Sequence, residues 1–299
     1  MRAVQFTEYG PPSVMHVAEV EEPHAGPGTI RIAARASGLG AGEVMVRSGK
    51  LQHMVPVTFP YRTGFDAAGV VDEVGDGVTG VRVGDEVFGM STLAMRAANA
   101  DHVLLAGWAP KPAGWSWAEA GGAAGSVETA ARVLDRLAVG AGQTVLVQGA
   151  AGGTGAVVVQ FAVARGATVI GTASERNHDF LRSLGAQPTT YGEGLPERAG
   201  RADAVVDCAG GQLADLVAIA GSPERVVTIA DFDAAAHGVH LSSGLSDPLA
   251  LHGLDVAVEL AAQGRLRIPV AAEFPLGEAA AAHELSESRH ARGKIVLVN

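Results

Sequence analysis

Residues Thr144–Gly155 read Thr-Val-Leu-Val-Gln-Gly-Ala-Ala-Gly-Gly-Thr-Gly, and this stretch decides the fold. A short apolar run stops at a glycine-rich turn. A helical pattern follows over 156–165, and a second apolar run covers 167–173. This order predicts the first half of a βαβ unit, in which a glycine-rich turn between a buried strand and a helix binds a dinucleotide.

Small residues occupy the three positions of the turn where such a unit needs them. Ala150 permits a tight turn, Gly152 lets the backbone approach a pyrophosphate, and Gly155 lets the helix pack close to the strand. Gly153 and Thr154 belong to the same turn before the helix, whose first N–H groups and partial positive charge favour phosphate. We therefore expect these five residues to bind the cofactor.

The end of the second apolar run indicates which dinucleotide binds. Units that bind NAD usually carry an acidic residue there, which accepts from the ribose 2′-OH, whereas this chain has Ala173. Ser174 and Arg176 follow, and a hydroxyl with a guanidinium suits a 2′-phosphate. Glu175 should then point away from the phosphate. The pattern predicts NADPH; otherwise Glu175 and Arg176 simply begin a solvated helix face.

Composition limits the class of protein. The 299 residues suffice for two domains, and no apolar run reaches the roughly 18 residues that a membrane span needs. The single cysteine excludes a disulfide framework and a multi-cysteine zinc site. With a net charge of −10 and no basic cluster, we expect no nucleic-acid or membrane partner, and a cytoplasmic protein.

The order of elements predicts an α/β protein with a β-barrel-like domain at 1–117, a parallel-sheet nucleotide domain at 118–264 and a return to the first domain at 265–299. Strands are expected in the first domain at Arg2–Phe6, Val14–Val20, Thr29–Ala36, Ala67–Val74, Asp85–Phe88 and Asp101–Leu105. The later elements expected are a helix at 118–137, strands at 204–207 and 225–229, a helix at 249–262, a strand at 266–271, a helix at 278–285 and a strand at 294–298.

Four segments together resemble the zinc-free quinone oxidoreductase branch of the medium-chain dehydrogenase/reductase superfamily. They are Met1–Gly10, Gly64–Gly89, Thr144–Gly155 and Gly293–Leu297, and the resemblance covers nearly the whole chain. It implies a GroES-like catalytic domain, a Rossmann domain, NADPH, and hydride transfer to quinones or activated alkenes. It also implies a homodimer, for which the strand-like segment Val239–Gly244 would supply the exposed sheet edge.

Two positions of the resemblance bear on metal. Zinc-dependent members carry Cys where this chain has Gly40, and His where it has Phe65. Because a catalytic zinc needs about three protein ligands, we expect no metal site. The quinone reductase branch commonly has Asn at the position of Gly40, so its loss widens the pocket near the nicotinamide.

Further cofactor residues follow from the resemblance. Tyr191 and Arg289 would join Ser174 and Arg176 at the 2′-phosphate, although Tyr191 can equally cap a surface loop and Arg289 can be solvated. The strand-end residues Thr172, Ala209 and Ile229 complete the expected cofactor set.

Without a metal, a hydrogen-bond donor must stabilise the oxyanion that forms when hydride reaches an α,β-unsaturated carbonyl. Tyr61 is the first candidate, because it directly precedes the Gly64-Phe65-Asp66 segment; its alternative is a packing role. Glu43 is a candidate general acid. Arg47 would hold the active-site loop, or form a structural ion pair.

The sequence thus favours an NADPH-dependent reductase of a quinone or an α,β-unsaturated carbonyl or alkene, working without zinc. Two alternatives remain open. One is a dedicated biosynthetic enoyl or imine reductase, and the other is a non-catalytic NADPH-binding protein with a structural or sensor role.

Overall fold

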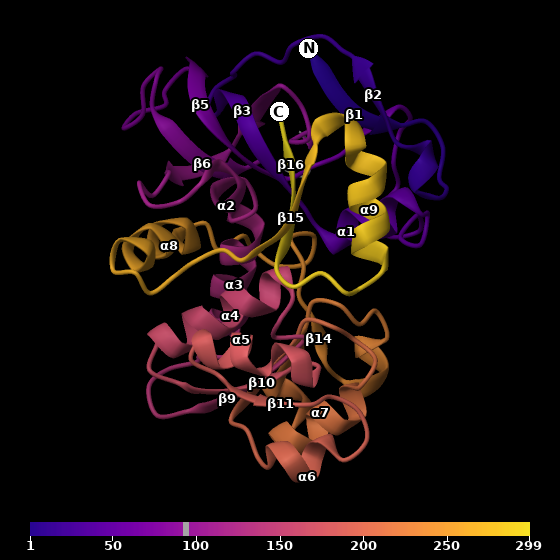
Figure 1. The fold of residues 1–299 in the computed structure, drawn as a ribbon, viewed down its shortest axis with the longest axis vertical. Coiled ribbons are helices and arrows are strands. Elements are labelled where there is room, and N and C mark those ends of the chain that lie inside the picture. Colours follow the sequence, from indigo (N-terminus) through magenta and orange to yellow (C-terminus); the bar gives the residue numbers. More distant parts are fainter. Residues whose placement is uncertain (92–95) are drawn as a thin grey trace. The chain divides into compact units, whose positions relative to one another are not determined.

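A computed structural model describes residues 1–91 and 96–299, which form two compact units (Figure 1). Unit 1 comprises Met1–Gly125 and Arg267–Asn299, and unit 2 comprises Ser126–Leu266. The first division therefore lies at residue 125, whereas the sequence placed it at 117. Helix α2 (Trp117–Gly121) accounts for the difference, because it packs on strands β3 and β5 of unit 1.

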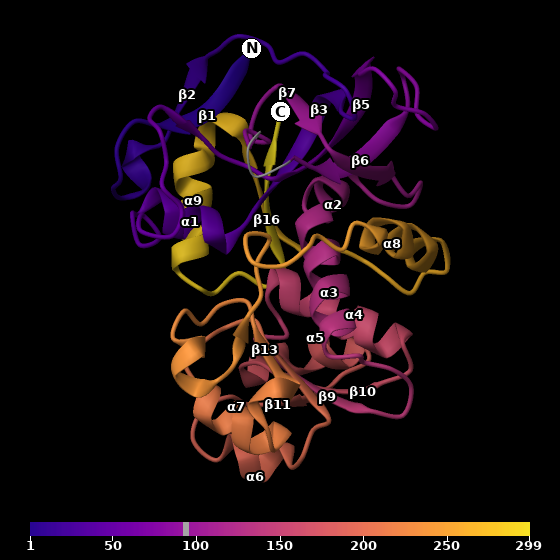
Figure 2. The same ribbon diagram turned by 180° about the vertical axis from the view of Figure 1, so that it is seen from behind.

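Unit 1 contains two sheets. The smaller is antiparallel, in the order β2-β1-β4, and the larger runs β15-β16-β3-β5-β6-β8, with β7 (labelled in Figure 2) paired to β3. The bounds are β1 (Arg2–Phe6), β2 (His16–Glu19), β3 (Ile30–Leu39), β4 (Tyr61–Arg62), β5 (Asp66–Val74), β6 (Glu86–Met90), β7 (His102–Leu105), β8 (Gly107–Pro110), β15 (Val270–Pro275) and β16 (Lys294–Val298). Since β16 pairs antiparallel with β3, the end of the chain completes the sheet that its beginning starts.

Two expected strands of this unit start later than the sequence indicated. The strand expected at 14–20 begins at His16, because Pro12–Val14 form a turn of 3-10 helix before it. The strand expected at 266–271 begins at Val270, directly after Pro269, which cannot donate a backbone hydrogen bond. Helices α1 (Ala41–Arg47) and α9 (Ala279–Glu287) complete the unit and contact each other.

Unit 2 is a six-stranded parallel sheet in the order β11-β10-β9-β12-β13-β14 (Figures 1 and 2). The strands are β9 (Thr144–Gln148), β10 (Thr168–Thr172), β11 (Gln187–Thr189), β12 (Ala204–Asp207), β13 (Val226–Thr228) and β14 (His240–Leu241). Numbered within the unit this order is 3-2-1-4-5-6, the doubly wound arrangement that binds dinucleotides beyond the carboxyl ends of its strands. The two-residue strand β14 lies at one edge.

The helices of unit 2 are α3 (Ala124–Arg136), which starts in unit 1, α4 (Gly153–Ala164), α5 (His178–Ser183), α6 (Leu195–Ala199), α7 (Leu213–Ala220) and α8 (His252–Ala262). The single helix expected at 118–137 is in fact two, because α2 ends at Gly121, with Gly122 as its C-cap, and α3 begins at Ala124. Strand β9 is an apolar run whose Val145, Leu146 and Val147 are fully buried, as expected for a central parallel strand. Across the described residues, no helix combines the length and apolar character needed to cross a membrane.

Candidate functional site

The glycine-rich turn after β9 is tied to the end of β10. The backbone N–H of Gly149 donates to Thr172 Oγ1 at 3.1 Å, and that of Ala150 donates to the carbonyl of Thr172 at 3.1 Å. A Cβ at Gly155 would lie 2.2 Å from the carbonyl oxygen of Gly149, so only glycine lets α4 begin this close to the turn. The hydroxyl of Thr172, which we expected at the cofactor, therefore holds the turn itself.

The amino end of α4 is open. Its N-cap is Gly152, which offers no side-chain cap, and the first turn contains no acidic residue. The free N–H groups and the positive end of the helix dipole therefore remain available to an anion. Ala150, Gly153, Thr154 and Gly155 lie with Gly152 in this one turn, which is the arrangement the sequence predicted.

A buried carboxylate that the sequence analysis did not single out organises the neighbouring strand ends. Asp207, fully buried at the end of β12, accepts from the N–H groups of Ala209 and Gly210 at 2.9 and 2.8 Å and from Thr228 Oγ1 at 2.7 Å. The N–H of Ile229 donates to the Asp207 carbonyl at 2.9 Å. Ala209 and Ile229 are thus held at the carboxyl ends of β12 and β13. The sequence could have indicated Asp207, because it is an acidic residue at the end of an otherwise apolar strand.

The residues expected at a 2′-phosphate fall in two places. Ala173 is buried at the end of β10, while Ser174 and Arg176 follow it in one turn, Arg176 with its side chain exposed. Tyr191, 58% exposed, follows β11, whose Thr189 pairs with Thr172 of β10. Arg289 belongs to unit 1, where it follows α9 with a left-handed φ of 56°.

The loop that contains Tyr191 is held by hydrogen bonds from Arg198. The guanidinium of Arg198 donates to the carbonyls of Thr190 at 3.1 Å and Glu193 at 2.8 Å. Sequence spacing did not reveal Arg198, because it acts on backbone atoms.

In unit 1, Glu43 is a buried acid on α1. Its Oε1 accepts from the N–H of Gly40 at 2.9 Å, and its Oε2 accepts from Asn99 Nδ2 at 3.2 Å. Burial raises the pKa of Glu43 to about 7; the hydrogen bond from Gly40 opposes the shift and the charge of Asp66 adds to it. A carboxylic acid that titrates near neutrality is suited to give or take a proton.

A chain of polar side chains extends from Glu43. The amide of Asn99 also donates to Thr63 Oγ1 at 2.8 Å, and its Oδ1 accepts from Ser37 Oγ at 2.8 Å. Asp66 and Lys294, both buried, form an ion pair of 3.5 Å. The described hydrogen bonds thus link Glu43 to three neutral side chains.

Tyr61, on β4, lies half-buried against Phe6, with ring centroids 5.2 Å apart. The guanidinium carbon of Arg96 lies 5.2 Å from the Tyr61 ring centroid and 5.3 Å from that of Phe65. Tyr61 and Phe65 therefore share one cation between them, and Arg96 was not a candidate in the sequence.

Arg47 is fully buried, and its contacts match those of a structural ion pair. Its guanidinium donates to the carboxylate of Glu287 and to the carbonyl of Gly10, which ties α1 to α9 and to the chain after β1. His283 of α9 is also fully buried, and in the described structure neither ring nitrogen has a hydrogen-bond partner. Burial lowers the pKa of His283 to about 4, with a further contribution from the charge of Arg47.

The positions that hold zinc in related enzymes are Gly40 and Phe65 here, and neither has a metal-binding side chain. Within residues 1–91 and 96–299, no group of three His, Cys, Asp or Glu side chains could hold a metal ion.

Two family models match the chain. The model of the alcohol dehydrogenase GroES-like domain matches residues 26–146, and that of the zinc-binding dehydrogenase matches residues 184–297. A quinone oxidoreductase from Coxiella burnetii is 30% identical in a match that covers 100% of this chain and 99% of that protein, with a TM-score of 0.85.

Two further matches bear on cofactor and substrate. A mycobacterial protein solved in complex with NADPH is 25% identical over 100% of both chains, with a TM-score of 0.81. The spectinabilin polyketide synthase system protein NorB of Streptomyces orinoci is 38% identical over 161 residues, which is 53% of this chain but only 7% of that protein.

Proposed function

The chain belongs to the quinone oxidoreductase branch of the medium-chain dehydrogenase/reductase superfamily, and from that premise we propose that it transfers hydride from NADPH to a quinone or an α,β-unsaturated carbonyl, without zinc. It is an oxidoreductase that uses a nicotinamide cofactor. The choice of NADPH, the acceptor and the independence from zinc are the parts we propose.

The observation that carries the proposal is the open amino end of α4 beside a strand end without an acid. The end of α4 favours a pyrophosphate, and Ala173 offers no carboxylate to a ribose 2′-OH. Ser174 and Arg176 supply a hydroxyl and a guanidinium in the next turn, which suits a 2′-phosphate. Tyr191 and Arg289 are the further residues we assign to that phosphate.

Bound NADPH would supply the hydride. The chain must then stabilise the charge that builds on the acceptor oxygen, and we assign this to the hydroxyl of Tyr61. Glu43 is the second group we assign to proton transfer, because its pKa of about 7 leaves part of the population protonated at neutral pH.

Cofactor titration tests the proposal first. We expect NADPH to bind on the order of 10- to 100-fold more tightly than NADH, since a charge-assisted hydrogen bond contributes about 1.5–3 kcal/mol. Arg176→Gln should remove most of that preference, whereas Arg182→Gln, a change in the neighbouring helix α5, should not. Equal dissociation constants for the two cofactors would refute the assignment.

Turnover tests the second part. NADPH oxidation should accompany reduction of a simple quinone or a small enone, it should survive chelators, and elemental analysis should find no stoichiometric zinc. Tight NADPH binding without turnover on any acceptor would favour a non-catalytic role instead.

The match to NorB favours a second candidate, a biosynthetic enoyl reductase that acts on a thioester. An enoyl thioester that is reduced at least tenfold more efficiently than the matching free enone would establish it. Equal efficiency would favour the general reductase.

We also propose a homodimer formed at the edge strand β14, because an unpaired strand edge can pair with its own copy. Light scattering at micromolar concentration should give twice the chain mass of 30.3 kDa. A monomer mass would contradict the proposal.

A further inference from the structure

Arg96 is a cation held between two aromatic rings. Its guanidinium carbon lies 5.2 Å from the centroid of Tyr61 and 5.3 Å from that of Phe65. Such contacts attract a guanidinium through the negative ring faces, and they orient its plane without using its N–H groups.

Those N–H groups have no acceptor in the part of the chain that the structure describes. No hydrogen bond or ion pair joins Arg96 to another described residue, and its Nε is buried without a partner. Three other arginines with little exposed side-chain surface differ: Arg31 Nε lies 2.9 Å from Asp72 Oδ1, Arg132 Nε lies 2.8 Å from Glu128 Oε1, and Arg47 pairs with Glu287. Burial lowers the pKa of Arg96, and the charge of Glu43 opposes this shift without reversing it.

The backbone beside Arg96 is fixed. Ala97 has a left-handed φ of 87°, and the next two residues donate to Gly64 and Thr63 at 3.2 and 3.1 Å. Gly64 has a φ of 100°, and a Cβ there would lie 2.4 Å from the backbone nitrogen of Asn99. A strained residue held by its surroundings in this way is typical of ligand sites.

Glu43 does not fill the role of counter-ion. Its charge affects the pKa of Arg96, but the described contacts include no ion pair or hydrogen bond between them, and the carboxylate accepts from Gly40 and Asn99 instead. None of the described residues thus occupies the guanidinium fork of Arg96, whose geometry suits an oxyanion.

We propose that Arg96 binds a carboxylate or phosphate group of the acceptor, so that the protein prefers acidic acceptors over neutral ones. This inference rests on the proposed function, because Arg96 lies against the ring of Tyr61, the residue we assign to the acceptor oxygen. It assigns to Arg96 the recognition of the acceptor and no part in the chemistry.

Paired acceptors test the proposal. The probes are 4-phenylbut-3-en-2-one and the same enone with a para-carboxylate or a para-phosphate on the ring. In the unaltered protein, kcat/KM should be higher for an anionic enone than for the neutral one. In Arg96→Gln the anionic-to-neutral ratio should fall about 10- to 100-fold, the effect of losing a charged hydrogen bond. Comparison of kcat/KM for the carboxylate and the phosphate enone shows which of the two groups Arg96 binds more strongly.

Two variants control the measurement. Arg62→Gln removes an exposed arginine next to Tyr61 and should leave the ratio within twofold of the parent. Arg96→Lys keeps the charge but loses the planar fork, so its ratio should lie between those of the parent and Arg96→Gln. A ratio in Arg96→Gln equal to the parent's, or in Arg96→Lys as low as in Arg96→Gln, would overturn the proposal.

A binding experiment tests the anion site independently of the proposed reaction. Benzoate and phenyl phosphate are titrated calorimetrically into the full chain without cofactor, and at least one should bind about tenfold more weakly to Arg96→Gln. If no acceptor is turned over but this difference is found, the proposed function fails and the anion site stands. If neither probe binds the parent, or both bind the variant equally well, the anion site is refuted.

Discussion

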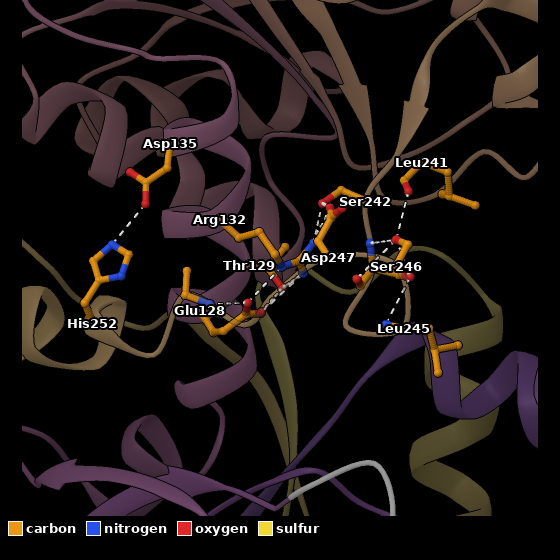
Figure 3. A network of polar contacts seen from close by, with 12 residues as sticks. Glu128, Thr129, Arg132, Asp135, Leu241, Ser242, Leu245, Ser246, Asp247 and His252 are labelled. Atoms are coloured by element: carbon orange, nitrogen blue, oxygen red, sulfur yellow. Dashed lines mark hydrogen bonds and ion pairs between the residues drawn. The ribbon is translucent and has the colours of Figure 1, made fainter.

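Each unit of the molecule buries one glutamate on a helix, and the two have opposite surroundings. Glu43 on α1 in unit 1 is 6% exposed and accepts from the neutral N–H groups of Gly40 and Asn99. Glu128 on α3 in unit 2 is 2% exposed and accepts from Arg132, whose Nε lies 2.8 Å from its Oε1 (Figure 3). Burial is alike in the two cases, but among the described contacts only Glu128 accepts hydrogen bonds from a cation, whereas the charges of Lys294 and Arg96 act on Glu43 without such a bond.

The network around Glu128 is extended. Arg132 also donates to Ser242 and lies 3.7 Å from Asp247, in the loop after β14 (Figure 3). Burial alone would raise the pKa of Asp247, but hydrogen bonds from Ser242 and His240 outweigh it and lower that pKa. Asp247 is therefore held charged, and the contacts of Glu128 and Asp247 with Arg132 join α3 to the loop after β14.

The difference teaches what makes a buried acid reactive. Neutral donors orient a carboxylate but only partly offset the cost of burying its charge, so the proton is retained up to neutral pH. A guanidinium that donates to the carboxylate, as Arg132 does to Glu128, offsets that cost. Unit 1 therefore holds an exchangeable proton beside Gly40, whereas the network of unit 2 joins α3 to the loop before α8.

The largest effect is expected at Tyr61, if the unit 1 site performs the proposed chemistry. Tyr61→Phe should lower kcat for an enone by about 10²- to 10⁴-fold, the usual contribution of a general acid. The dissociation constant for NADPH should not change, since the glycine turn is untouched. A rate within about twofold of the parent would remove Tyr61 from the mechanism and leave catalysis to positioning of the reactants.

The next effect is on stability and lies in unit 2. Arg132→Ala leaves Glu128 buried without its cation and removes the 3.7 Å ion pair with the partly exposed Asp247, which should together cost about 3–5 kcal/mol. Urea unfolding at pH 7 measures the loss. The matched control is Arg136→Ala, an exposed position one turn later on α3, which should stay within about 0.5 kcal/mol of the parent. Equal losses in the two variants would show that the network contributes no net stability.

A third effect concerns the pH dependence of stability that Glu43 causes. The pKa of Glu43 is raised above its ordinary 4.5, so its contribution to stability is lost as pH rises from about 4.5 to about 7. Since one pKa unit corresponds to about 1.4 kcal/mol, the loss should approach about 3 kcal/mol. Glu43→Gln should not show this decline, so its stability relative to the parent should rise with pH across that range. A constant difference from pH 4.5 to 7 would show that Glu43 titrates normally.

The smallest effect concerns an ion pair at the surface of unit 2. His252 and Asp135 lie 3.0 Å apart (Figure 3), with side chains 57% and 44% exposed. His252→Gln should cost no more than about 1 kcal/mol, because water screens exposed pairs. A loss of stability as large as that of Arg132→Ala would mean that burial does not make the Arg132–Glu128 pair more stabilising than the exposed His252–Asp135 pair.

Local patterns were enough to predict the parts of the fold that consecutive residues determine. Strands β12 and β16 have the bounds that their apolar runs indicated, and the turn between β9 and α4 has the expected structure. Helix α1 was missed because its seven residues start beside Gly40 and Gly42, which suit turns as well as helices.

The site was predicted less completely, for the same reason. The five residues of the glycine turn lie within the six positions 150–155 and were found together. Arg96 was not, because its role depends on Tyr61 and Phe65, which lie on other elements. Asp207 acts on backbone N–H groups, and no side-chain spacing reveals such contacts.

The unpaired His283 has a consequence for how unit 1 responds to acid. Its pKa, lowered from 6.5 to about 4, means that stability is lost as pH falls through that interval, while Glu43 has the opposite response. Between about pH 4.5 and 6.5 the unfolded chain protonates the histidine and the folded chain protonates the glutamate, so each state binds one proton at this pair. The effects of His283 and Glu43 on the pH dependence of stability therefore cancel. Over these two pH units, unfolding causes no net uptake or release of protons at the two residues.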